Sequence, residues 1–69
     1  MEYRNTTQPL DTKVRAAVTM FEANTGRAAS WVAVHPDDCN PVYAYLIARS
    51  GLSLHLSYSA LWRETVIVG

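Results

Sequence analysis

SWVAVHPDDCNPVYAYLIARSGLSLHLS, residues 30–57, is the stretch that decides the fold of this chain. Its first part, Trp31-Val-Ala-Val34, is a compact run of aromatic and β-branched residues. Such a run is typical of a strand buried on both faces. Pro36 ends the strand, because proline has no N–H to donate to a neighbouring strand. The stretch therefore begins with a strand and a turn.

A helix and a second strand are predicted to follow this turn. Asn40-Pro41 is a start signal, since the Asn side chain can accept from free backbone N–H groups and proline suits the first helical position. The predicted helix runs from Pro41 to Ser50, and Gly51 suits a left-handed C-terminal cap. Leucines then alternate with polar residues over 52–57. This period of two predicts a strand with one apolar face.

The flanking segments add one more helix and one more strand. Residues 9–24 carry an apolar stripe at helical spacing, which predicts a helix. Gly26 is placed to end this helix, and we expect the Lys13 side chain to lie outside the stripe. Thr65-Val-Ile-Val68 is a short β-branched run that predicts a final buried strand. The stripe of the first helix consists of Leu10, Val14, Ala17, Val18 and Phe21.

We therefore expect the α+β class, with two helices packed on one face of a small three-stranded mixed sheet. The elements follow the order helix, strand, helix, strand, strand, in a single domain over 9–69 after a polar N-terminal tail at 1–8. The strand–helix–strand unit predicts parallel strands. Because the last strand is the most apolar, we expect it in the centre, antiparallel to both neighbours. An edge hairpin of the last two strands is the alternative.

Composition limits the classes of function. The chain has 69 residues, and a chain of this size buries only about 60% of its unfolded surface, which makes dimerisation an attractive source of stability. Six basic and six acidic residues balance, which argues against nucleic acid as a partner. The absence of a long apolar stretch argues against a membrane. A lone cysteine without a visible signal peptide favours a cytoplasmic location.

The richest polar cluster follows the first strand: His35, Asp37, Asp38 and Cys39. The simplest interpretation is that these residues end the strand and cap the helix. The alternative is a metal site formed by His35 and Asp37 together with His55 from the next strand, since imidazole and carboxylate groups are zinc ligands.

Cys39 is placed shortly before a helix N-terminus, a position that lowers the pKa of a thiol. A nucleophile also needs a base that a third group orients, and no such group is visible in the sequence. We therefore predict no catalytic residue and no cofactor.

Aromatic and leucine side chains provide the candidate interaction site, which consists of Tyr43, Tyr58, Leu61 and Trp62. Tyr43 and Tyr45 cannot share one helix face, so at least one should point outward. Exposed Tyr and Trp side chains are typical of protein-binding surfaces. Ordinary amphipathic rings at the edge of a core remain the other interpretation.

Residues 31–69 resemble part of the peripheral domain of tailed-phage major capsid proteins. The resemblance rests on the order of Trp31–Val34, the His35-Pro-Asp-Asp38 turn, the helix at 41–50 with Gly51, and the strands at 52–57 and 65–69. It implies a structural or interaction role, and no functional residue follows from it.

The sequence thus predicts a small non-catalytic protein-interaction or structural module of phage or mobile-element origin. It would act by self-association or by binding a protein partner. A small metal-binding protein or metal-dependent enzyme that uses the turn of His35, Asp37 and Asp38 is the alternative. A nucleic-acid-binding regulator is a third option, against which the neutral charge argues.

Overall fold

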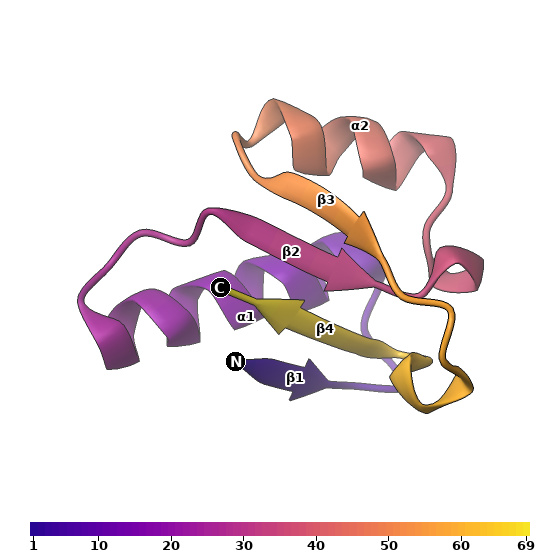
Figure 1. The fold of residues 1–69 in the computed structure, drawn as a ribbon, viewed down its shortest axis with the longest axis horizontal. Helices are drawn as coiled ribbons and strands as arrows, with labels where there is room; N and C mark the ends of the chain where they lie inside the picture. Colours follow the sequence, from indigo (N-terminus) through magenta and orange to yellow (C-terminus); the bar gives the residue numbers. More distant parts are fainter.

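The computed structural model describes residues 1–69 as two helices and a four-stranded sheet (Figure 1). Short 3-10 turns at Pro36–Asp38 and Ala60–Trp62 lie in two of the connections. The other elements are β1 (Glu2–Arg4), α1 (Leu10–Thr25), β2 (Trp31–Val34), α2 (Pro41–Arg49), β3 (Ser53–Leu56) and β4 (Thr65–Val68).

The sheet has the strand order β1-β4-β2-β3. β2 and β3 are parallel, with Trp31 opposite Ser53 and Val34 opposite Leu56, and α2 connects them. β4 runs antiparallel to both of its neighbours, β1 and β2. The predicted α+β class and the parallel pair are therefore confirmed.

The predicted number and order of the strands are wrong. β4 does not separate the two strands of the parallel unit, and β3 and β4 do not form a hairpin. Instead Glu2–Arg4, which we expected in a polar tail, forms a fourth strand along β4. With β1 on one side and β2 on the other, β4 has antiparallel neighbours on both sides. β3 can then pair directly with β2.

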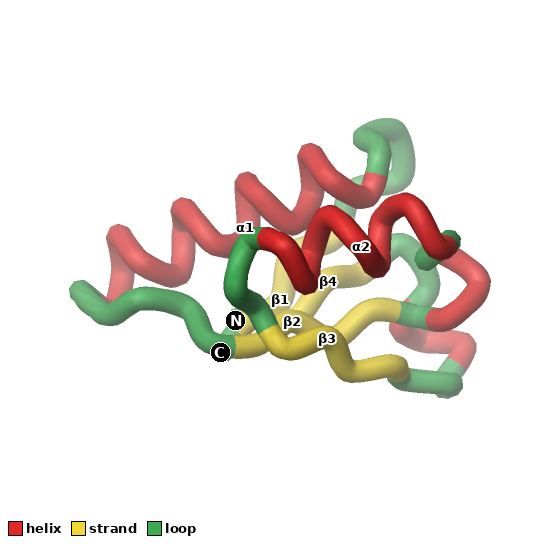
Figure 2. Tube along the Cα trace, turned by 90° about the horizontal axis from the view of Figure 1, so that it is seen from above, coloured by secondary structure: helices red, strands yellow, loops and turns green.

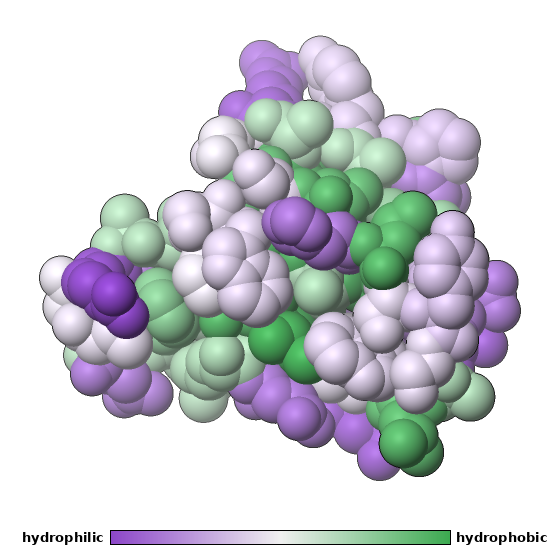
Figure 3. Space-filling model, viewed as in Figure 1, coloured by the Kyte–Doolittle hydropathy of each residue, from purple (hydrophilic) through white to green (hydrophobic).

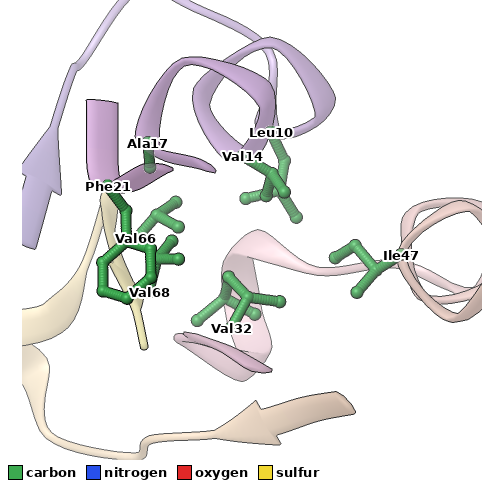
Figure 4. Close-up of a cluster of buried hydrophobic side chains, with 9 residues drawn as sticks. Leu10, Val14, Ala17, Phe21, Val32, Ile47, Val66 and Val68 are labelled. Carbon is green, nitrogen blue, oxygen red and sulfur yellow. The ribbon is translucent and has the colours of Figure 1, made fainter. Parts of the chain in front are cut away.

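Both helices lie on the same side of the sheet, as predicted (Figure 2). α1 packs over β1 and β4, and α2 packs over β3. The close-up in Figure 4 shows the side chains of α1 and Ile47 of α2 directed toward the valines of β2 and β4. The fully buried valines of the sheet are Val32, Val34, Val66 and Val68.

The predicted helix ends are confirmed. The Asn40 side chain accepts a hydrogen bond from the Tyr43 N–H at 3.0 Å, and Pro41 takes the first helical position. Gly26 ends α1 at φ 68°, and Gly51 follows α2 at φ 88°. A side chain is strained at such angles, which explains glycine at both helix ends.

The opposite face of the sheet has no covering layer, and Figure 3 shows it as a mixture of apolar and polar side chains. Strand alternation directs Trp31, Ala33, His55 and Ile67 to this face. The rings of Trp31 and His55 meet edge to face, with centroids 5.8 Å apart. A Cβ on Gly69 would collide with the Trp31 indole, so the ring lies directly against the end of the chain.

The formation of β1 can be tested with two neighbouring substitutions. Tyr3 packs against the core and its hydroxyl donates to the Gln8 side chain at 2.8 Å, whereas Glu2 is exposed on the other face. Tyr3→Ala should lower the free energy of unfolding by about 2 kcal/mol, which is less than the loss for a fully buried aromatic ring. Glu2→Ala should change it by less than about 0.5 kcal/mol.

Urea unfolding of the two variants and the parent chain measures both effects. If both substitutions changed the free energy of unfolding by the same small amount, residues 2–4 would not pack as a strand.

Candidate interaction surface

The polar turn after β2 is a structural element rather than an open site. His35 is only 7% exposed, and its Nδ1 accepts the backbone N–H of Asp37 at 3.0 Å. This hydrogen bond requires the neutral ring with its proton on Nε2. The His35 side chain thereby holds the start of the 3-10 turn, as expected of a residue that caps a turn.

Asp38 connects this turn to the segment before β4. Its Oδ1 accepts from Arg63 Nε at 2.9 Å, and its Oδ2 accepts from the Glu64 N–H at 2.6 Å. Burial by itself raises the pKa of the Asp38 carboxyl, but the hydrogen bonds from Glu64 and Arg63 and the nearby positive charges outweigh it, so the pKa is lowered. The contact with Asp38 in turn raises the pKa of Arg63.

Glu64 has a positive φ of 61°, which is uncommon for a residue with a side chain. Its backbone is held on both sides. Its N–H donates to Asp38, and its carbonyl accepts from the Asn5 N–H at 3.3 Å and from Lys13 Nζ at 3.5 Å. A non-glycine residue in this conformation costs about 1–3 kcal/mol unless surrounding contacts impose it.

The Lys13 side chain is buried, which differs from the expectation that the helical pattern gave. We expected its side chain off the apolar stripe, yet Lys13 is only 5% exposed on the inner side of α1. Its methylene groups can pack with the stripe while the ammonium group reaches the Glu64 carbonyl and the vicinity of Asp38. Neither Lys13 nor Arg63 could be linked to Asp38 from the sequence, since no local pattern couples residues 25 or more positions apart.

The structure does not bring the proposed metal ligands together. No group of three or more His, Cys, Asp or Glu side chains is placed to hold a metal ion. His55 lies against Trp31 on the uncovered face, whereas His35 and Asp37 contact each other at 3.9 Å beside Arg63. The metal alternative therefore has no geometry to support it.

The expectation for Cys39 is also wrong. Burial raises the pKa of its thiol instead of the helix lowering it. The sulfur donates to the Asn40 carbonyl at 3.7 Å, and His35 already uses its Nδ1 in the turn. The position before α2 does not activate this cysteine.

The predicted interaction residues separate into two places. Tyr58, Leu61 and Trp62 share the β3–β4 connection, where Tyr58 is 78% exposed, Leu61 is 89% exposed and Trp62 is half-buried. Tyr43 packs against the core from α2 instead.

Tyr45 of α2 is exposed, which agrees with the expectation that one of the two tyrosines points outward. Sequence reasoning missed the exposure of Val42 and Leu46 on the same helix. Beside them the two helices leave a groove of about 250 Å³, lined mainly by Val14, Tyr43, Leu46 and Ile47 and bordered by the Asp11–Arg15 ion pair.

No protein-family model, no curated protein and no solved structure matches this chain. Neither of its helices has the length and apolar character needed to span a membrane.

The Asp38 contacts predict how stability depends on pH. A carboxyl whose pKa is lowered by folding stabilises the fold above its unfolded pKa of about 3.9, and this contribution is lost as the pH falls through the folded value. Asp38→Asn should therefore cost about 2 kcal/mol at neutral pH, and the difference from the parent chain should shrink below about pH 4.

Asp37→Asn is the matched control, since the Asp37 side chain is 70% exposed and should contribute little. Denaturant unfolding at a series of pH values provides the measurement. A cost for Asp38→Asn that stays constant down to acidic pH would contradict this role of the ionised carboxylate.

Proposed function

We propose that the chain is a small non-catalytic protein-interaction or structural module that acts through self-association or by binding a protein partner. The observation that carries this proposal is the exposure of Tyr58 and Leu61, which are three residues apart in one connection, with the half-buried Trp62 following Leu61 in the sequence. Contiguous exposed apolar side chains mark interaction sites on soluble domains. Fully burying one such side chain contributes about 1.5–3 kcal/mol.

The way the β3–β4 connection is held also favours binding. Its C-terminal end is held by the contacts of Asp38 with Arg63 and Glu64, and Ala60–Trp62 forms a 3-10 turn closed by the Trp62 and Arg63 N–H groups. A segment that is already ordered loses less conformational entropy when a partner covers it. More of the energy from burying Leu61 is then available for affinity.

An origin in a phage or a mobile element is part of this proposal. It rests on the resemblance of residues 31–69 to the peripheral domain of tailed-phage capsid proteins, where the matching positions are structural. That resemblance favours assembly over catalysis.

Leu61→Glu tests the surface. The Leu61 side chain makes little contact with its own chain, so the variant should keep the parent melting temperature within the range of surface substitutions. Placing a charge in a buried interface should weaken association by roughly tenfold or more. Light scattering on a sizing column over a range of protein concentrations measures the effect for self-association.

Met20→Glu is the matched control, because Met20 is an exposed apolar residue on α1, outside the proposed surface. Association that is unchanged in Leu61→Glu but weakened in Met20→Glu would place the contact surface on α1 and refute this assignment.

A further inference from the structure

We propose that the outer face of α2 packs against α2 of a second copy of the chain, with the two helices antiparallel across a two-fold axis. This inference rests on the proposed function, since it names the partner and the contact for one mode of self-association. The contact is separate from the β3–β4 connection, so each copy has two contact surfaces.

The outer face of α2 is apolar, like the face that packs in the core. Ile47 lies on the core face and is buried. Val42, Tyr45 and Leu46 follow the i, i+3, i+4 spacing that places side chains on one stripe of a helix. Val42 is 65% exposed and Tyr45 is 62% exposed. A helix at the surface of a small domain normally carries polar residues on this side, so the stripe is suited to packing against a further helix.

A groove adjoins this stripe on the same surface. It lies between α1 and α2, measures about 250 Å³, and is lined by Val14 and Tyr43 among others. Leu46 belongs to the stripe and also lines the groove. Across a two-fold axis, residue i of one copy contacts residue j of the other, and the reverse also holds. One axis beside α2 therefore lets each copy place its stripe on the groove of the other, and the surface is complementary to itself.

The charges at the two ends of this surface favour an antiparallel second copy. Because β1, β2 and β3 are parallel and α1 and α2 connect them, both helices start at the same end of the molecule (Figure 1). Asp11 borders the groove from the first turn of α1. Arg49 lies in the last turn of α2, at the other end of the stripe, and is the only Asp, Glu, Lys or Arg from 41 to 62. An antiparallel copy brings its Arg49 to the end where Asp11 lies.

Both charged groups are available for this contact. Arg49 forms no ion pair within its own chain. Asp11 contacts Arg15 at 3.2 Å, but its side chain is still 34% exposed, and a carboxylate has two oxygens that can accept from two cations. A parallel arrangement would place the two Arg49 side chains together, where like charges repel. The charge pattern therefore matches itself only when the two copies of α2 are antiparallel.

Reversal of the two charges tests the pairing and identifies the partner. Arg49→Glu and Asp11→Lys should each weaken association by about tenfold, because each places like charges opposite each other. The double variant restores an opposite pair, so its association should lie within about threefold of the parent chain. Light scattering on a sizing column over a range of protein concentrations measures association of all four chains.

Val42→Glu tests the apolar stripe. Val42 is exposed in the first turn of α2, where a carboxylate suits the helix dipole, so the variant should fold. A charge in the buried contact should weaken association by roughly tenfold or more. Met20→Glu is the matched control, since Met20 is exposed on α1 and does not line the groove, and it should leave association unchanged. Circular dichroism of every variant checks that it folds.

Association that Leu61→Glu weakens and Val42→Glu leaves unchanged would overturn the α2 pairing and leave the proposed function intact. Losses for Arg49→Glu and Asp11→Lys that simply add in the double variant would show that these groups do not face each other, and would also overturn the pairing. If the chain stays monomeric when concentrated, the pairing is wrong, and only binding to a different protein then remains of the proposed function.

Discussion

The burial of the β2 and β4 valines beneath the two helices is the constraint on which the rest of the structure depends. Val32, Val34, Val66 and Val68 are fully buried, and all four lie on the helix side of the two central strands. Because side chains alternate along a strand, the remaining positions of these strands face the side that no helix covers. Two helices suffice for one face of the sheet only. The single-sided core therefore leaves the other face of the sheet without a covering layer.

Asp38 connects this core to the exposed β3–β4 connection. One carboxylate accepts from Arg63 and from the backbone of Glu64, immediately before β4 begins. These contacts offset the unfavourable left-handed conformation of Glu64 and set the direction in which the chain enters β4. These contacts fix the C-terminal end of the segment that carries the exposed Tyr58 and Leu61 side chains.

Local signals in the sequence predicted the local structure well. The Asn40-Pro41 start, the two glycine caps and the parallel strand–helix–strand unit are all present. The order of the strands could not be obtained in the same way. It depends on the pairing of residues 2–4 with β4, more than sixty positions away, and a three-residue polar strand has no period to reveal it.

For the candidate sites too, features set by neighbouring residues could be predicted, whereas contacts between residues far apart in the sequence could not. Tyr58 and Leu61 are exposed, whereas Tyr43 is half-buried because its side of α2 also packs against the core. The contacts of Asp38 with Arg63 and the burial of Lys13 required the three-dimensional arrangement.

The central claim is that a single-sided core in so small a chain gains part of its stability from association. The most direct measurement is the melting temperature of the unaltered protein as a function of its concentration. Association of the folded state predicts that the melting temperature rises with concentration, since binding to the native state alone stabilises it by mass action. A melting temperature that is constant from dilute to concentrated protein would show that the core under α1 and α2 is sufficient by itself, and would contradict the account.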